Sequence, residues 1–271
     1  MTGDVAPAGA GNEPVVVKLG GETLADQHDT LRGVAALAPD YRLVIVHGGG
    51  KRLSTWLERL GIESRWEAGR RVTDDAALEV AVAVLGGLVN RELVATLLGL
   101  GVDAVGLSGI DGGLLVAERI AGLGRVAHVV DARPELLDVL LSTGRVPVVA
   151  PLAVDETGQV CNVNADEVAA GLARALRARL VLLSDTDGVR DGDGSRIDRL
   201  DPAAAAALIA DGRISGGMIP KVRGGLSVLA AGGREVVIAD GRSPDALRRA
   251  LDDPGFGTRL VRPVARSRAR S

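Results

Sequence analysis

Val15-Val16-Val17-Lys18-Leu19-Gly20-Gly21 is the stretch of sequence that decides the fold. Its β-branched run is typical of a buried strand, and the glycines that follow allow backbone N–H groups to approach an anion. Leu43-Val44-Ile45-Val46 repeats the pattern ahead of His47-Gly48-Gly49-Gly50. Two buried strands that end in glycine turns indicate an open parallel sheet, which binds its ligand at the carboxyl ends of the strands.

Short apolar runs alternate with longer helical patterns along the rest of the chain. We expect strands at 15–19, 42–47, 103–107, 114–118, 126–130, 145–150, 180–184 and 235–239. We expect helices at 24–37, 51–60, 76–98, 134–142, 165–178, 202–210, 221–231 and 243–251. This order predicts an α/β protein, a three-layer αβα sandwich around a mainly parallel sheet. The runs 114–118 and 126–130 are close enough in sequence to form a hairpin instead.

Composition describes an ordinary globular chain and excludes some partners. The 271 residues are 46% hydrophobic and 25% charged, with a net charge of -3. That charge gives no broad attraction to nucleic acid or to an anionic membrane. Cys161 is the single cysteine, which is compatible with a reducing cytosol, and Met1–Pro14 has no signal-peptide pattern. No uninterrupted apolar run has the length of a membrane span, so we expect a cytoplasmic protein without a membrane partner. The net charge leads us to expect no nucleic-acid partner either.

Several familiar nucleotide and metal motifs are absent. Gly50-Lys51 looks like the end of a P-loop, but Ile45 occupies the first glycine position and Arg52 replaces the Ser or Thr that would bind magnesium. No Gly-x-Gly-x-x-Gly follows a predicted strand, and the three histidines are scattered without metal-ligand spacing. We therefore expect no metal ion held by protein ligands. The residues that remain for chemistry are lysine, glycine and aspartate.

That set of residues suits phosphoryl transfer from ATP to a carboxylate. A carboxylate is already an anionic nucleophile, so the enzyme needs cations and glycine-loop amides rather than a general base. Lys18 at a strand end could serve one side of the moving group. Lys221, after Pro220 at a helix start, could serve the other. Asp166 could orient both lysines. Without the two lysines, the simpler interpretation of Asp166 is a carboxylate in the first turn of a helix that Asn164 caps.

Two further polar residues could bind the substrate. Arg71 offers a planar fork for a carboxylate, while its alternative interpretation is a solvated pair with Arg70. Asn162 could hydrogen-bond the same substrate, or it could simply form a turn in a loop. Each of these signals is weak when taken singly.

In order and spacing, these segments resemble the amino acid kinase family, in particular its members that phosphorylate N-acetyl-L-glutamate. The likeness runs from about Val15 to Leu260. The segments that carry it are Lys18–Gly21, Val46–Gly50, Arg71–Asp74, Gly106–Gly112, Asn162–Asp166, Leu183–Val189 and Gly217–Lys221. So many blocks in the same order are hard to obtain by chance.

The resemblance implies a role for each candidate residue. Lys18 and Lys221 would stabilise the transition state, and Asp166 would hold both. Gly20 and Gly21 would contact phosphate, and substrate would be bound by Gly49, Gly50, Arg71 and Asn162. ATP, with Mg²⁺ held mainly by its phosphates, would lie against Asp185, Thr186, Asp187, Gly188, Val189, Arg190, Arg213, Ile214 and Ser215. The product would be N-acetyl-L-glutamyl 5-phosphate, formed in arginine biosynthesis.

The resemblance also implies an organisation. It divides the chain into an N-terminal lobe, 1–178, which binds the amino acid and dimerises, and a C-terminal lobe, 179–271, which binds ATP, around an eight-stranded sheet. Arginine-inhibited relatives carry an extra N-terminal helix that links dimers into a hexamer, whereas Met1–Pro14 is short and rich in Gly, Ala and Pro. We expect a homodimer that arginine does not inhibit. The tail with Arg262, Arg266, Arg268 and Arg270 is expected to be a solvated end rather than a polyanion site.

Two alternatives stay open at the level of sequence. One is a kinase that phosphorylates aminoadipate or glutamate attached to an acidic carrier protein in lysine biosynthesis, since Gly106–Gly112 suits either enzyme. Arg71-Val72-Thr73 and the intact Asn162–Asp166 string favour the free acetylated substrate. The other is a non-catalytic nucleotide-binding protein on the same fold. Retention of both lysines and of Asp166 argues against it, because a binding protein could lose them without harm.

Overall fold

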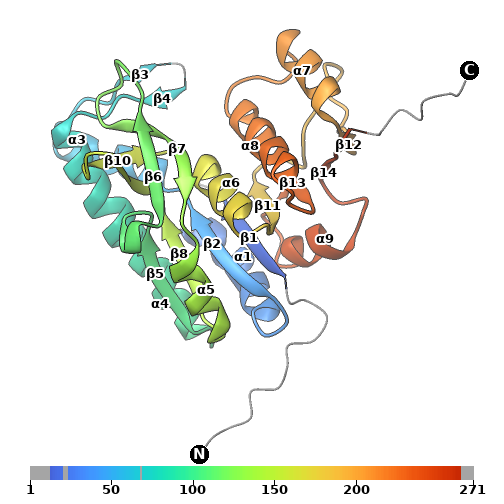
Figure 1. Ribbon diagram of the computed structural model, residues 1–271, viewed down its shortest axis with the longest axis horizontal. Coiled ribbons are helices and arrows are strands. Elements are labelled where there is room, and N and C mark those ends of the chain that lie inside the picture. Colours follow the sequence, from blue (N-terminus) through green and yellow to red (C-terminus); the bar gives the residue numbers. More distant parts are fainter. Residues whose placement is uncertain (1–12, 21–23, 68, 264–271) are drawn as a thin grey trace, which may run out of the picture.

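The computed structural model describes residues 13–20, 24–67 and 69–263, and its central element is an eight-stranded sheet (Figure 1). The strand order is β12-β14-β13-β11-β1-β2-β8-β5. The strands are β1 (Pro14–Leu19), β2 (Arg42–His47), β5 (Ala104–Ser108), β8 (Val146–Ala150), β11 (Arg179–Ser184), β12 (Arg199–Leu200), β13 (Val236–Asp240) and β14 (Thr258–Leu260). All neighbours are parallel except β13 and β14. The expected eight-stranded, mainly parallel sheet is confirmed, but its strands β12 and β14, of two and three residues, were not predicted from the sequence.

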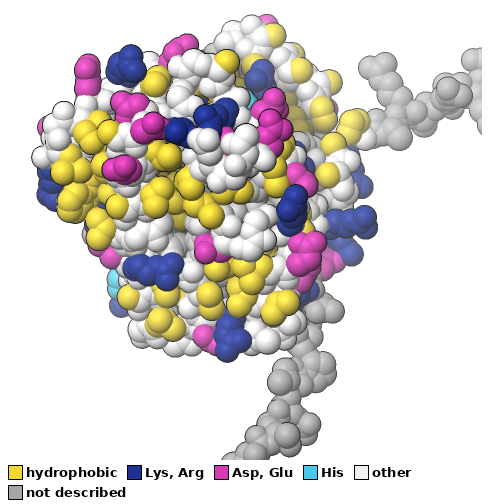
Figure 2. Space-filling view, turned by 60° about the vertical axis from the view of Figure 1, so that its left-hand side comes forward, with side chains coloured by type: hydrophobic (Ala, Val, Ile, Leu, Met, Phe, Trp, Pro, Cys, Tyr) yellow, Lys and Arg dark blue, Asp and Glu magenta, His cyan; other side chains and the backbone are white. Residues whose placement is uncertain are grey.

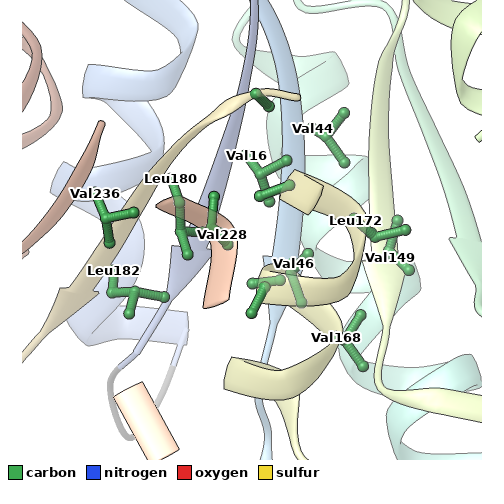
Figure 3. Packing of buried hydrophobic residues seen from close by; sticks show 14 of the residues in the cluster. Val16, Val44, Val46, Val149, Val168, Leu172, Leu180, Leu182, Val228 and Val236 are labelled. Carbon is green, nitrogen blue, oxygen red and sulfur yellow. The ribbon is translucent and has the colours of Figure 1, made fainter. Parts of the chain in front are cut away.

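The central strands are buried on both faces, because their alternate side chains enter two separate cores. Val15, Val17 and Leu19 of β1 belong to one core, and Val16 belongs to the other. Figure 3 shows the second core, where valines and leucines of the strands meet side chains of two helices. Burial on both faces explains why β1 and β2 read as continuous apolar runs.

Helices cover both faces, which gives the expected three layers (Figure 1). The first face carries α1 (Leu24–Leu37), α2 (Gly50–Arg59), α3 (Asp75–Ala81), the π-helical segment η1 (Val82–Val89), α4 (Asn90–Gly99) and α9 (Ala246–Asp252). The second face carries α5 (Glu135–Ser142), α6 (Ala165–Ala175), α7 (Pro202–Ala210) and α8 (Met218–Ala230). A short 3₁₀ turn, η2 (Asp111–Gly113), follows β5.

The expected helix at 76–98 is confirmed as a continuous helix from Asp75 to Gly99 that contains the π-helical segment. The Asp74 side chain caps it by accepting a hydrogen bond from the Ala77 amide. By length and composition this helix could cross a membrane, but such a helix is also found in the cores of soluble proteins, and 44% of its most apolar window is buried here. Val82, Leu88 and Leu98 remain exposed on it.

The assignment of 114–118 and 126–130 to the central sheet is wrong, and the hairpin alternative is correct. β6 (Leu115–Arg119) and β7 (Val126–Ala132) pair antiparallel. With β9 (Leu152–Asp155) and β10 (Val160–Val163), they close a small barrel in the order β10-β7-β6-β9. β9 and β10 were not predicted, since four residues are too short to show a clear alternation.

Smaller differences occur at the ends of helices and in a short hairpin. β3 (Trp66–Glu67) and β4 (Arg70–Arg71) form a hairpin that was not predicted, because each strand has only two residues. α8 begins at Met218 rather than at Lys221, and Pro220 still lies in its first turn. α6 ends at Ala175 rather than at 178, just before Arg177 adopts a positive φ of 50°.

A buried polar network joins β2 to its neighbours at the edge of the sheet where the strands end. Asn90 is fully buried, and its Nδ2 donates to the carbonyls of Val148 at 2.8 Å and Leu107 at 3.2 Å. The same Nδ2 lies 3.2 Å from His47 Nε2, and His47 Nδ1 lies 2.7 Å from the Gly48 carbonyl. Because a carbonyl can only accept, His47 Nδ1 carries the proton, and Nε2 is the acceptor of the neutral ring. The neutral imidazole fixes the chain where it enters the glycine turn.

We predict that His47 makes the protein less stable at acidic pH. Burial lowers the pKa of His47 to about 4, outweighing the hydrogen bond to Gly48, which raises the pKa. Between the unfolded pKa of about 6.5 and the folded value, only the unfolded chain binds the proton, so the free energy of unfolding falls as pH falls. The expected loss between pH 7 and pH 5 is about 2 kcal/mol.

The measurement is urea unfolding of the wild type and of His47→Gln at both pH values. Buried carboxylates also titrate in acid, so the quantity that decides is the difference between the two proteins. The pH-dependent loss should be smaller in His47→Gln by about 2 kcal/mol. Equal losses in the two proteins would contradict the prediction.

Candidate active site

A pocket of about 230 Å³ opens at the carboxyl ends of β1 and β2, on the first residues of α2 and α6. This is the edge of an open parallel sheet at which ligands bind. Among the predicted site residues, the pocket wall contains Lys18, Gly49, Gly50, Arg71, Asn162 and Asp166. The pocket thus brings together residues that come before the barrel strands in the sequence and residues that come after most of them. Lys221 and the residues predicted to bind ATP lie outside this wall.

Asp166 lies between the two predicted lysines. Lys18 Nζ is 3.1 Å from Asp166 Oδ1, and Lys221 Nζ is 3.0 Å from Oδ2. All three side chains are largely buried: Lys18 is 10% exposed, Lys221 is 15% exposed and Asp166 is 7% exposed. Lys221 Nζ also donates to the Gly217 carbonyl at 3.3 Å. One carboxylate therefore holds two ammonium groups from different elements of the fold.

Local sequence explains why these three residues converge. Asn164 caps α6 through its Oδ1, which accepts from the Asp166 amide at 2.8 Å and so fixes the first turn. Helix α8 packs closely on α6 because Gly224 has no side chain, and a Cβ at that position would lie 3.1 Å from the Ala170 Cβ. That close approach brings Lys221, one turn earlier on α8, to Asp166.

The electrostatics of this cluster favour an anionic ligand. Burial alone would raise the pKa of Asp166, but the attraction of Lys18 and then of Lys221, with their hydrogen bonds, lowers the pKa below its ordinary value. The carboxylate is therefore ionised at neutral pH. Two ammonium groups and one carboxylate leave an excess of positive charge beside the pocket, in surroundings that screen charge poorly. A phosphoryl group bearing negative charge fits that excess.

The glycine turn after β2 contributes a second anion-binding feature. Gly49 has a φ of +131°, a conformation that other residues rarely adopt, and a Cβ there would lie 2.8 Å from Leu85 Cδ2. Helix α2 starts at Gly50 without a side-chain cap, and its first residue lines the pocket. Unpaired N–H groups at the start of a helix attract anions.

Gly20 differs from the expected phosphate contact. Its amide donates to the Leu183 carbonyl at 2.7 Å, so in this conformation the N–H is already used between the ends of β1 and β11. A Cβ at Gly20 would lie 2.5 Å from that carbonyl and 3.3 Å from Lys18 Nζ. The glycine is thus required by close packing beside Lys18. Gly21 lies outside the described residues.

Arg71 is held in place by several partners on the β3–β4 hairpin side of the pocket. Its Nη2 donates to Ser54 Oγ at 2.5 Å and to the Gly50 carbonyl at 3.3 Å, and its Nη1 donates to Ser64 Oγ. The Trp66 ring covers the guanidinium, with Cζ 4.5 Å from the ring centroid. Burial lowers the pKa of Arg71, but an arginine stays protonated at neutral pH. The solvated pair with Arg70 considered from the sequence is therefore wrong.

Asn162 lies on strand β10 rather than in a loop, so its interpretation as a turn residue is wrong. Its backbone pairs with β9 and β7, and its Nδ2 donates to Thr73 Oγ1 at 3.2 Å. The amide faces the pocket, whose wall it shares with Val163 and Asn164. The barrel thus supplies one wall of the site.

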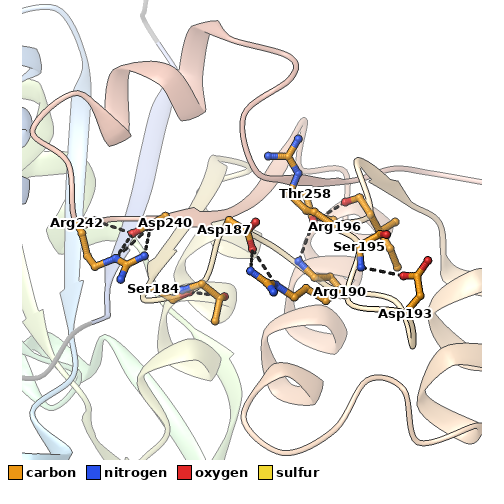
Figure 4. A network of polar contacts seen from close by, with 12 residues as sticks. Ser184, Asp187, Arg190, Asp193, Ser195, Arg196, Asp240, Arg242 and Thr258 are labelled. Carbon is orange, nitrogen blue, oxygen red and sulfur yellow. Dashed lines mark hydrogen bonds and ion pairs between the residues drawn. The ribbon is translucent and has the colours of Figure 1, made fainter.

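The segment predicted to bind ATP follows β11 at the same edge of the sheet. β11 pairs with β1 and β13, so Asp185–Arg190 starts beside the end of β1. Figure 4 shows this region as a network of polar side chains. Arg190 pairs with Asp187 at 3.2 Å, and Arg213 Nη1 reaches back to Asp191 at 2.8 Å. The structure therefore brings Arg213 next to the end of this segment, although 22 residues lie between Arg190 and Arg213 in the sequence.

Two of the side chains predicted to contact ATP are buried in this conformation. Val189 is fully enclosed and Ile214 is 2% exposed, and both belong to the core of the second face. Their burial in the core fixes the backbone next to the polar residues predicted to bind ATP. The Val189 amide donates to Thr258 Oγ1 at 2.8 Å, and Ile214 precedes the turn in which the Met218 amide donates to the Ser215 carbonyl.

Sequence reasoning missed Trp66 and Glu167 near the pocket. Trp66 lines the pocket and stacks on Arg71, and Glu167 pairs with Arg70. A signal for Trp66 did exist, because aromatic residues are only 1% of the chain and this one lies close to the Gly69-Arg70-Arg71 motif. Glu167 gave no such signal, since an acidic residue in the first turn of a helix is common.

In the described ranges, no group of three or more His, Cys, Asp or Glu side chains is arranged to hold a metal ion. The side-chain donors in the pocket wall are the Lys18 ammonium group, the guanidinium groups of Arg70 and Arg71, and the amides of Asn162 and Asn164. This set suits a ligand that carries negative charge.

Comparisons with known proteins show which family the chain resembles. The acetylglutamate kinase of Solibacter usitatus is 44% identical over 253 residues, which span 91% of this chain and 98% of that protein. That of Dehalococcoides mccartyi (strain BAV1) is 39% identical over 259 residues, covering 92% and 95%. The N-acetylglutamate synthase of Neisseria gonorrhoeae shares the fold, with a TM-score of 0.80 at 23% identity over 93% of this chain and 60% of that one. The sequence profile of the amino acid kinase family matches residues 13–240, and the chain belongs to the amino acid kinase family.

Proposed function

We propose that this protein transfers the γ-phosphoryl group of ATP to the side-chain carboxylate of N-acetyl-L-glutamate, a step of arginine biosynthesis. The observation that carries the proposal is Asp166 with its two lysines beside a pocket that also contains Arg71. Relatives named acetylglutamate kinase, 39–44% identical over most of the chain, support the choice of substrate.

The chemistry follows from the charges. A carboxylate oxygen of the substrate attacks the γ-phosphorus, the bond from that phosphorus to the β–γ bridging oxygen breaks, and the products are an acyl phosphate and ADP. No proton has to move, so no general base is needed. Lys18 and Lys221 stabilise the negative charge on the moving group and on the leaving oxygen, and Asp166 keeps both ammonium groups in place.

Binding of the acid is assigned to the barrel side of the pocket. Arg71 presents a planar fork to a carboxylate, and Asn162 offers an amide that can both donate and accept. Gly49 and Gly50 let the backbone at the start of α2 approach the substrate. The arginine that binds the acid is thus a different residue from the two lysines that stabilise the phosphoryl group.

ATP is assigned to the C-terminal part of the chain, with 1–178 as the acid-binding lobe and 179–271 as the nucleotide-binding lobe. The central sheet runs through both, because β11 pairs directly with β1. Asp185, Thr186, Asp187, Gly188, Arg190, Arg213 and Ser215 supply polar groups around the end of β11. Mg²⁺ would be bound through the ATP phosphates, where it would neutralise part of their charge.

The two alternatives predict different substrates. A carrier-dependent kinase would act only on an acid attached to a carrier protein, and a non-catalytic binding protein would turn over no carboxylate. The buried lysine pair on Asp166 disfavours the non-catalytic alternative, because burying charged groups is costly. We further propose that the enzyme acts in the cytoplasm without a nucleic-acid or membrane partner.

We also propose that the enzyme is a homodimer, joined through the exposed face of α2 and of the long helix Asp75–Gly99. A groove of about 660 Å³ on this face is lined by apolar side chains that include Trp56, Leu60, Val84 and Leu88. Figure 2 shows hydrophobic side chains gathered on the side of the molecule that carries this helix. Glu92 Oε2 is buried there without a hydrogen-bond partner among the described residues. Exposed apolar patches of this kind mark interfaces.

Acyl phosphate trapping tests the reaction. With ATP and Mg²⁺, hydroxylamine should yield hydroxamate from N-acetyl-L-glutamate but not from free glutamate, aspartate or aminoadipate. Lys221→Met should lower kcat by about 10²- to 10³-fold, because one preorganised cation is lost. Arg223→Met, two residues further on the same helix and exposed, should keep the activity. Hydroxamate from none of the acids would favour the carrier-dependent or the non-catalytic alternative.

A second prediction concerns Arg71. Arg71→Lys keeps the charge but loses the fork, so the KM for N-acetyl-L-glutamate should rise about tenfold or more. The KM for ATP should not change. Arg59→Lys is the matched control, since Arg59 also lies over a tryptophan, 5.4 Å from the Trp56 ring centroid. A KM for the acid equal to that of the wild type would remove Arg71 from the substrate site.

Light scattering tests the dimer. The chain mass of 27.8 kDa should be doubled in solution. Leu88→Glu puts a charge in the groove and should give a monomer, because a buried unpaired carboxylate is costly. Val139→Glu changes an equally apolar residue that is 61% exposed on α5, away from the groove, and should stay dimeric. A monomeric wild type would overturn the proposal.

A further inference from the structure

The β3–β4 hairpin carries two consecutive arginines whose side chains take different paths. Arg71 is buried against the pocket, while Arg70 reaches across to α6 and β7. Both arginines contribute to the pocket wall. Successive residues of a strand point to opposite faces, so their guanidinium groups reach different partners, and Arg70 is the one that fastens the strand to α6. Arg70 Nη2 donates to Glu167 Oε1 at 2.5 Å, and the two side chains are 22% and 18% exposed.

Glu167 is the residue after Asp166 in the first turn of α6. Asn164 Oδ1 caps both of their amides, at 2.8 Å and 3.4 Å. The other Glu167 oxygen, Oε2, lies 3.0 Å from His128 Nδ1 on β7. A single capped turn therefore presents Asp166 to the two lysines and Glu167 to the hairpin.

The backbone pairing of the hairpin is short. Each strand has only two residues, and Trp66 and Glu67 are exposed. Backbone bonds fix its base, where the Val72 amide donates to the Arg65 carbonyl and the Thr73 amide donates to the Leu123 carbonyl. Beyond that base, two arginines tie the hairpin to the rest of the site: Arg71 to α2 through Ser54 and the Gly50 carbonyl, and Arg70 to α6 through Glu167.

We propose that Glu167 is a positioning residue that fixes Arg71 through Arg70, and so sets the affinity for the acid substrate. The inference rests on the proposed function and deepens it. The phosphoryl-site carboxylate and the substrate-binding arginine are then held by the same helical turn. Loss of the bond loosens the hairpin, so binding of the acid weakens while the lysine cluster keeps its geometry.

The kinetic test uses Glu167→Gln, which removes the charge and keeps the shape. The KM for N-acetyl-L-glutamate should rise roughly three- to tenfold, as expected for a charge-assisted bond with partial solvent access. Values of kcat and of the KM for ATP should not change, whereas general damage to the fold would lower kcat too. Glu156→Gln, an exposed change at the β9–β10 turn, is the matched control.

A double-mutant cycle tests the coupling between the two residues. Arg70→Gln should reproduce the effect of Glu167→Gln, and the double variant should be no worse than either single variant, because both remove one bond. Fully additive effects of the two substitutions would overturn the proposal. An acid KM equal to that of the wild type in Glu167→Gln would also overturn it.

Hydrogen–deuterium exchange of the free protein tests the same bond without any substrate. Exchange in the segment 64–72 should be faster in Glu167→Gln and unchanged in Glu156→Gln, while α8 should exchange as in the wild type. Wild-type exchange at 64–72 in Glu167→Gln would refute the positioning role. If the wild type phosphorylates no acid, the proposed function fails, and the exchange comparison still decides the role of Glu167.

Discussion

The shared salt bridge of Asp166 with Lys18 and Lys221 is the interaction on which the site depends. Two ammonium groups brought together without it would repel each other in poorly screened surroundings. With it, three elements of the fold, β1, α6 and α8, are fixed to a common point. Each contributes through local features: the buried strand end at Lys18, the Asn164 cap, and the close packing of Gly224 on Ala170. The same arrangement leaves one excess positive charge for an anionic ligand.

The central sheet makes this geometry rigid. β1 is buried on both faces, and Lys18 is a charged residue in an otherwise apolar strand. It is tolerated because its ammonium group reaches Asp166 at the strand end. The neighbouring ends of β2 and β11 are fixed as well, one by the His47–Asn90 network and the other by the Gly20–Leu183 bond. Strands β1, β2 and β11 therefore present their loops at one edge without freedom to drift apart.

The opposite side of the pocket is formed by elements with short backbone pairing. A small barrel and a two-residue hairpin carry Asn162 and Arg71. Their backbone pairing is short, so side chains do more of the positioning: Thr73 holds Asn162, and Ser54, Ser64 and Trp66 hold Arg71. This division is physically reasonable, because the phosphoryl site needs fixed charge whereas a substrate wall must admit and release a small acid.

The sequence by itself determined six of the eight strands of the central sheet, most helices and the main cations of the site. Long apolar periods and glycine turns are local signals, and Lys18, Asp166 and Lys221 lie near the ends of elements that those signals mark. It did not determine the barrel, the β3–β4 hairpin or the partners of Arg70, because strands of two to four residues show no period. Only the tertiary structure decided that the Gly20 amide is already bonded, that Val189 and Ile214 are core residues, and that Glu167 reaches Arg70. Those outcomes depend on contacts between residues far apart in the chain, which no local pattern encodes.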